Sequence, residues 1–191
     1  MRSTTTTFIR RHVFSLPLGR IFTTRDLLGY GRRSAVDQAV SRLVKSSTIV
    51  RLARGVFIRT GSPIPDTFEI ARAKAEAFGK QIAAHAGKLA FDLGLTAKAL
   101  AEPAFAVNAG SSSFQAGPVR IHLKKTAHRK LHLGDRPAGR ALRALWHVGK
   151  KMVDGACLTS ATARLGRTDR AEIRQAASLL PAWLMLHFLR D

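Results

Sequence analysis

The sequence predicts an α+β protein with an N-terminal domain of helices and one β-hairpin, followed by a small mixed α/β domain. Apolar residues recur at helical spacing over most of the first 45 residues, and the next segment alternates apolar and polar residues around a glycine-containing turn. The Ser-Pro-Ile-Pro run at residues 62–65 then interrupts regular structure. We therefore expect one domain over residues 1–61, a linker over residues 62–65 and a second domain over residues 66–191.

Three helices are expected in the first domain. The first covers residues 4–15, and a short second helix covers residues 22–29 with Thr23 or Thr24 as its N-cap. The third covers residues 32–45, where an apolar stripe leaves a basic, hydrogen-bonding face to solvent. A short turn containing glycine joins the second and third helices, as a helix-turn-helix requires.

Residues 49–59 predict a hairpin with a three-residue loop at residues 53–55, whose last position is glycine. One strand face is aliphatic and consists of Val50, Leu52, Val56 and Ile58. We expect this face to cover the helices, and we expect Arg51, Arg54 and Arg59 to point outward or along the edge. Three helices followed by a basic hairpin make a winged helix-turn-helix.

The charge indicates a polyanionic partner, because the net charge of +20 is costly in self-repulsion unless an anion relieves it. In a winged helix the third helix enters the major groove of double-stranded DNA, where Arg33 can bind guanine and Ser34 or Gln38 other base edges. Arg42 and Lys45 are assigned to phosphates, and Arg54 to a phosphate or the minor groove. The full predicted DNA-binding set is Arg32, Arg33, Ser34, Gln38, Ser41, Arg42, Lys45, Arg51 and Arg54. A winged helix that serves only protein contacts is the alternative.

The run from Ser34 to Lys45 and the run from Thr48 to Phe57 resemble the N-terminal winged-helix domain of AbiEi-type antitoxins of abortive-infection, type IV toxin-antitoxin systems. The resemblance rests on Ser-Arg-Leu at residues 41–43 and Arg-Gly-Val-Phe at residues 54–57, where the family usually has Tyr in place of Phe57. A looser resemblance to the family continues at residues 90–96 and 105–110.

This resemblance implies a transcriptional repressor that binds operator repeats in its own promoter and counteracts a nucleotidyltransferase-type toxin encoded alongside. Direct contact with the toxin is left open, as is the oligomeric state. A stand-alone winged-helix regulator of a mobile element is the alternative. A weaker alternative is an RNA-binding or ribosome-associated protein. It is weaker because an aromatic content of 7% offers few side chains on which bases can stack.

The second domain carries its own basic block at residues 120–151, where Asp135 is the only acidic residue. A strand over residues 119–124 has one basic face, and a helix over residues 135–151 carries an arginine stripe without acidic partners. This second basic face consists of Arg120, Lys124, Lys125, Arg129, Lys130, Arg136, Arg140 and Arg143. This face either contacts nucleic acid or the toxin, or it is a solvent-exposed face with an excess of basic residues. Further helices are expected over residues 66–78, 168–180 and 181–189.

No enzyme, cofactor or metal site is expected. His122, His128 and His132 lie close in sequence without a nearby carboxylate to complete a metal shell, and the acidic residues show no paired spacing. The single cysteine, Cys157, fits a reducing compartment. The longest apolar run, residues 179–189, is too short for a membrane span, so we expect a cytoplasmic protein. The Thr- and Arg-rich, acid-free first 25 residues are also typical of an organellar transit peptide.

Overall fold

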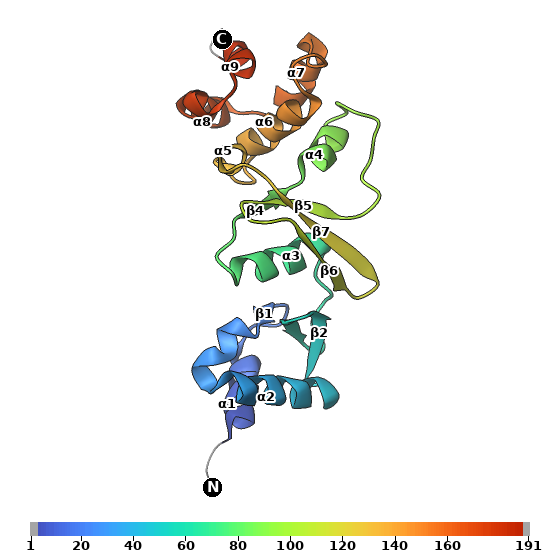
Figure 1. The fold of residues 1–191 in the computed structure, drawn as a ribbon, viewed down its shortest axis with the longest axis vertical. Helices are drawn as coiled ribbons and strands as arrows, with labels where there is room; N and C mark the ends of the chain where they lie inside the picture. The colour runs from blue at the N-terminus through green and yellow to red at the C-terminus, as the bar shows by residue number, and fades with distance from the viewer. Residues whose placement is uncertain (1–3, 189–191) are drawn as a thin grey trace. The chain divides into compact units, whose positions relative to one another are not determined.

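The computed structural model describes residues 4–188 and shows a mixed α/β fold with helices and a seven-stranded sheet (Figure 1). The strand order is β1-β3-β2-β6-β7-β5-β4. The chain divides into two compact units, of which the first comprises Met1–Gly79 and Ser113–Ile121 and the second Lys80–Ser112 and His122–Asp191. This division differs from the predicted domain boundary, because residues 62–65 lie inside the first unit, in a stretch without helix or strand.

The first unit contains α1 (Thr5–Ser15), β1 (Phe22–Thr23), a 3-10 helix η1 (Arg25–Tyr30), α2 (Arg33–Lys45), β2 (Ile49–Ala53), β3 (Val56–Arg59), α3 (Thr67–Glu76) and nearly all of β6 (Ser112–Ala116). The helices predicted over residues 4–15, 32–45 and 66–78 are confirmed to within two residues at either end. Asp66 begins α3 through a capping box, in which its side chain accepts from the Glu69 amide while the Glu69 side chain accepts from the Asp66 amide.

The short helix predicted over residues 22–29 is partly wrong. Phe22 and Thr23 form strand β1, which pairs antiparallel with β3, and helical structure begins only at Arg25. The predicted N-caps Thr23 and Thr24 make no capping bond to the helix. Instead, the Asp26 carboxylate accepts hydrogen bonds from the Thr23 backbone amide at 2.7 Å and the Thr23 hydroxyl at 3.0 Å. Burial of Phe22 against Phe57 favours the strand over another helical turn.

The predicted hairpin is present, with a two-residue turn in which Gly55 adopts a φ of +78°. The predicted face was wrong, because Ile49 and Phe57, not the aliphatic set, belong to the core built with α1 and α2. Arg59 shares this inner face and donates to the carbonyl oxygens of Phe14 and Leu16. The aliphatic face is buried as well, except at Val50, because α3 contacts β3 from the opposite side. Both strand faces are therefore largely covered, and alternation alone could not decide which one meets the first helices.

The second unit contains β4 (Ile82–Ala84), α4 (Ala86–Asp92), β5 (Ala104–Val107), most of β7 (Val119–Lys125), α5 (His128–Leu131), α6 (Pro137–Val148), α7 (Gly155–Thr162), α8 (Arg167–Gln175), a 3-10 turn η2 (Ala177–Leu179) and α9 (Ala182–Phe188). Strand β5 pairs parallel with β7 and antiparallel with β4. Helix α6 contacts α4, α5, α7 and α8, so it is the centre of the helical part of this unit.

The strand predicted over residues 119–124 is confirmed, with Ile121 and Leu123 buried. The helix predicted over residues 135–151 is shorter and begins at Pro137. The helix predicted over residues 168–180 is α8 followed by η2. The last predicted helix corresponds to α9, where Leu184 and Phe188 are core, while Leu189 lies outside the described residues. Among the described residues, no helix has the length and apolar character to cross a membrane.

Candidate nucleic-acid interface

Helix α2 presents a polar face to solvent. Val36, Ala39, Val40 and Leu43 are buried against α1 and η1, and their spacing fixes which residues point outward. Five of the six predicted binding residues on this helix, Arg33, Ser34, Gln38, Arg42 and Lys45, are exposed, and Ser41 is half-buried. Arg42 and Lys45 lie in the last turn, where the helix dipole favours cations.

Arg33 makes an ion pair that the sequence analysis did not anticipate. Its Nε lies 2.9 Å from Oδ2 of Asp37 one turn later, and both side chains are more than half exposed. An exposed pair of this kind is worth about 0.3–0.5 kcal/mol, whereas a bidentate contact to a guanine discriminates by about 1–3 kcal/mol. The pair therefore orients Arg33 without preventing a stronger contact.

A pocket of about 340 Å³ joins the start of α2 to the turn of the β2–β3 hairpin. Arg33 and Arg54 both line it, although they are 21 positions apart in sequence. Arg25 and Lys74 add two further cations, and none of the described residues that line the pocket is acidic. Its apolar lining includes Leu28, Val56, Ala77 and Phe78. The first unit therefore gathers four positive side chains around one hollow.

Sequence reasoning missed Arg25 and Lys74. The Arg25 guanidinium lies 5.7 Å from the ring centroid of Phe78, and the Lys74 ammonium donates a 2.8 Å hydrogen bond to the Arg54 carbonyl oxygen. Both contacts depend on α3 packing beside the hairpin, and no local pattern signals that packing. Of the other predicted residues, Arg32 is exposed at the start of α2, and Arg51 is exposed with its guanidinium 5.6 Å from the Phe57 ring centroid.

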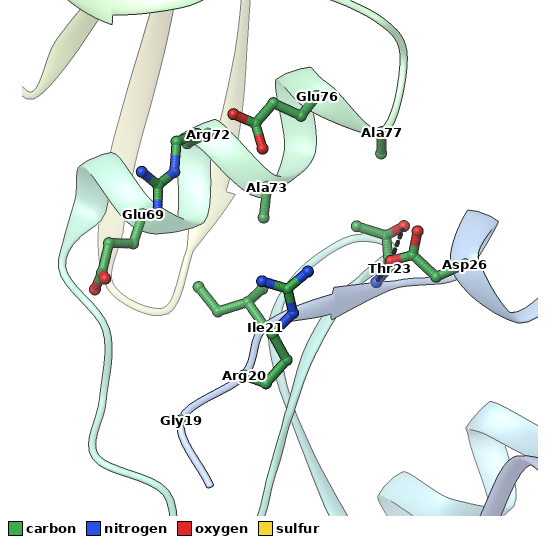
Figure 2. Close-up of a pocket in the computed structure, with 10 residues that line it drawn as sticks. All are labelled: Gly19, Arg20, Ile21, Thr23, Asp26, Glu69, Arg72, Ala73, Glu76 and Ala77. Atoms are coloured by element: carbon green, nitrogen blue, oxygen red, sulfur yellow. Dashed lines mark hydrogen bonds between the residues drawn. The ribbon is translucent and has the colours of Figure 1, made fainter. Parts of the chain in front are cut away.

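A second pocket in the first unit, of about 360 Å³, has mixed charge (Figure 2). Arg20 and Arg72 line it together with the carboxylates of Asp26, Glu69 and Glu76. Asp26 accepts hydrogen bonds from Thr23, and Glu69 serves the capping box of α3, so two of these carboxylates already have backbone partners. Across residues 4–188, no group of three or more His, Cys, Asp or Glu side chains is arranged to hold a metal ion.

The predicted arginine stripe on the second basic face is corrected by the structure. Arg143 has a side chain only 1% exposed, and it donates to the Gly134 carbonyl oxygen and, at 2.6 Å, to Asp135. Arg140 also lies 3.5 Å from Asp135, and Arg136 pairs with Glu172 of α8 at 2.7 Å. All three arginines therefore have acidic partners, because Asp135 lies just before α6 and α8 packs against it. Burial lowers the pKa of Arg143, and Asp135 opposes this shift.

The rest of the second basic face is divided between the two units. Arg120 belongs to the first unit and donates to the Ser113 hydroxyl at 3.2 Å. Lys124, Lys125 and Arg129 are exposed in the second unit, and Lys130 is half-buried beside them. These four residues of the second unit lie within seven positions of the sequence, at the end of β7 and in α5.

The three histidines that are close in sequence do not form a group. His122 pairs with Glu102, whereas His128 and His132 are exposed. A histidine pair that the sequence analysis missed joins His85, at the start of α4, to His147 of α6, with ring centroids 6.3 Å apart. Burial, His147 and Lys124 lower the pKa of His85, in that order of size.

Of the comparisons with known proteins, one identifies a family. A search of proteins with curated descriptions gives no match. A family model described as "Family of unknown function (DUF6088)" matches residues 8–173, which include both basic regions and most of both units. The match covers well over half of the chain, and the chain therefore belongs to the DUF6088 family.

Proposed function

We propose that this protein is a transcriptional repressor that binds double-stranded DNA through a winged helix in its first unit. The order of elements supports this proposal: a helix, a short strand, a short helix, a longer helix and a hairpin, with the short strand paired to the hairpin. The exposed polar face of α2 is the counterpart of a recognition helix, and the β2–β3 hairpin is the counterpart of a wing.

The observation that carries the proposal is the shared pocket of Arg33 and Arg54. A recognition helix and a wing act on one duplex only if their cations face the same ligand. Here the first turn of α2 and the hairpin turn line one hollow with four cations and no described acidic residue. DNA carries about one negative charge per 1.7 Å of helix axis, so a cationic region of this kind complements it.

The residues of α2 fall into two proposed classes. Arg33, Ser34 and Gln38 lie in the first half of the helix and are proposed to read base edges in the major groove. Arg42 and Lys45 lie in the last turn and are proposed to bind phosphates. Arg54 is proposed to bind a phosphate or the minor groove beside the wing.

The biological role we propose is that of a cytoplasmic antitoxin, which represses its own promoter and counteracts a nucleotidyltransferase-type toxin encoded alongside. This proposal rests on the resemblance of residues 34–57 to AbiEi-type antitoxins. A growth assay tests it. The adjacent open reading frame is induced in a heterologous host with and without this chain. If growth is arrested without this chain and restored with it, the antitoxin role is supported. If growth arrest persists, or if no arrest occurs, a stand-alone regulator is favoured.

DNA binding is tested separately, on a duplex selected by the full-length protein from a random pool. Arg33→Ala and Gln38→Ala should each cost about 1–3 kcal/mol on the selected site and relax base preference. Arg42→Ala should weaken binding to all duplexes alike. It should also reduce by about one the slope of log affinity against log salt concentration, which we call the salt slope. Lys98→Ala, which removes an exposed cation of the second unit, is the control. Equal losses of specific and non-specific binding in Arg33→Ala, Gln38→Ala and Arg42→Ala would contradict the assignment.

A further inference from the structure

The carboxylates of the second unit are all engaged locally within the described residues. Four of them form ion pairs, namely Asp92 with Lys88, Glu102 with His122, Asp135 with Arg140 and Arg143, and Glu172 with Arg136. The other two, Asp154 and Asp169, accept hydrogen bonds from the backbone amides of Cys157 and Gly166 at the starts of helices. Several cations of this unit take part in none of these ion pairs.

Four such cations lie within seven residues, at the end of β7 and the start of α5. They are Lys124, Lys125, Arg129 and Lys130, and we call them the Lys124–Lys130 cluster. None of the four makes an ion pair among residues 4–188. Three are exposed and Lys130 is half-buried. The cluster therefore presents positive charge to solvent without internal neutralisation.

The backbone of the cluster is held in place. Lys125 pairs with Val107 of the parallel strand β5, and its amide donates to the Ser111 hydroxyl at 2.9 Å. The next amide, of Thr126, donates to the Val107 carbonyl oxygen at 2.8 Å. A fixed backbone reduces the entropy lost when side chains bind a ligand, so this segment is suited to binding.

Trp146 of α6 fixes the other half of the cluster. The Arg129 guanidinium lies 5.4 Å from the Trp146 ring centroid, and the Lys130 ammonium lies 5.0 Å from it. Each of these cation–π contacts is an electrostatic attraction between the positive charge and the face of the ring. The ring therefore holds two like charges side by side, at a cost in repulsion that an anion would relieve.

Lys130 of the cluster and the nearby His85 have lowered pKa values. Burial lowers the pKa of Lys130, and Arg129 lowers it further. The pKa of His85 is lowered mainly by burial and also by His147 and Lys124. Burial is the largest cause of both shifts, and the smaller contributions of Arg129 and Lys124 have the sign expected of nearby positive charge.

We propose that the Lys124–Lys130 cluster binds the backbone phosphates of duplex DNA, independently of base sequence. This inference rests on the proposed DNA-binding function and adds a second contact in the second unit. A duplex is favoured over single-stranded nucleic acid because Arg129 and Lys130 already lie over Trp146, so that ring is not open for a base to stack. Lysine and arginine side chains on a fixed backbone are typical phosphate contacts.

The test uses the full-length chain and a 30-bp duplex of random sequence, with affinity measured by fluorescence anisotropy at several salt concentrations. The variant K124Q/K125Q/R129Q should reduce the salt slope by about two to three, because each lost phosphate contact changes it by about 0.9. The matched control K98Q/R164Q/R167Q removes the same charge from exposed positions elsewhere in the second unit and should leave the slope nearly unchanged. Because Arg129 packs on Trp146, the double variant K124Q/K125Q is measured as well, with an expected reduction of about two.

The outcomes separate this inference from the proposed function. If the unsubstituted protein binds neither this duplex nor any selected site, the proposed function fails and the inference fails with it. If it binds, and the cluster variants and the control behave alike, the inference is overturned while the proposed function stands. The inference would also be overturned if the cluster variants lost affinity only for a single-stranded oligonucleotide of the same length and not for the duplex. A larger slope change in both cluster variants than in the control supports it.

Discussion

The Lys74 ammonium on α3 donates a 2.8 Å hydrogen bond to the main-chain carbonyl oxygen of Arg54 in the turn of the β2–β3 hairpin. The bond crosses 20 positions of sequence and ties α3 to the tip of the proposed wing. Because the acceptor is a backbone atom, the Arg54 side chain remains available to a ligand. Helix α3 therefore acts as a support for the wing.

Replacing Lys74 by Met should loosen the hairpin turn while keeping most of the aliphatic stem. We expect a loss of about 1 kcal/mol in the free energy of unfolding, since this is the usual net worth of one hydrogen bond. Affinity for a selected duplex should fall as well, because Arg54 would be held less firmly and because the pocket would lose one of its four cations. Urea unfolding and anisotropy measure the two effects, with Lys98→Met as control. Unchanged affinity in Lys74→Met would show that the wing needs no support from α3.

The same packing predicts that a fragment of residues 1–61 is less stable than one that also contains α3. Val56 and Ile58 are buried on the hairpin face that α3 contacts, and each large apolar side chain left exposed costs about 1.5–3 kcal/mol. Such losses approach the stability of a small domain. We expect residues 1–79 to unfold at a clearly higher temperature than residues 1–61 in a thermal melt followed by circular dichroism. Equal melting temperatures would contradict this role of α3.

Local signals predicted much of the first unit. The apolar stripes of α1 and α2, the Asp66 cap and the hairpin turn at Gly55 each depend on residues only a few positions apart. Strand β1 escaped prediction because it has only two residues, too few for a periodic pattern. The prediction of which hairpin face meets the first helices was wrong. The aliphatic face that the alternating pattern indicates is buried by α3, which lies later in the chain.

The candidate site was predictable only in part. The exposed cations of α2 follow from its helical spacing, but the pocket that joins Arg33 to Arg54 depends on tertiary packing. Arg143 looked like Arg136 and Arg140, since all three fall on one stripe in sequence. Arg143 is buried because Asp135 lies just before α6 and because other helices surround α6. The spacing of the arginines in the sequence indicates neither feature.

Arg143 and Arg136 should therefore differ sharply when replaced by Ala. Arg143→Ala leaves Asp135 without its closest ion-pair partner and removes a buried side chain, so we expect a loss of about 3–5 kcal/mol in the free energy of unfolding. Arg136→Ala removes a pair whose arginine is more than half exposed, at a cost below about 1 kcal/mol. Chemical denaturation of both variants checks this contrast. Similar losses of stability in the two variants would mean that the buried Arg143–Asp135 pair stabilises the fold no more than the exposed pair does.

His85 should make the protein less stable in mild acid. Its Nδ1 accepts a 3.1 Å hydrogen bond from the Gly87 amide at the start of α4, which requires that nitrogen to be unprotonated. Because folding lowers its pKa, the unfolded chain binds more protons as the pH falls through about 6.5, and this contribution to stability is then lost.

His147→Gln should reduce this loss, since His147 is one of the two neighbouring groups that lower the pKa of His85. Lys124→Gln should act in the same direction. Thermal melts between pH 7.5 and pH 5.5 compare these variants with the exposed control His128→Gln. The same pH dependence in His147→Gln and His128→Gln would speak against coupling between the two rings.

The first unit is discontinuous in sequence, because Ser113–Ile121 belong to it although 33 residues separate them from Gly79. On a ribosome that adds about 5–20 residues per second, the 42 residues from Gly79 to Ile121 take roughly 2–8 seconds to appear. During this time β2 lacks the partner that Ala116 of β6 supplies to Ala53. We therefore expect Ala53 at the end of β2 to lack its strand partner while this segment is being synthesised.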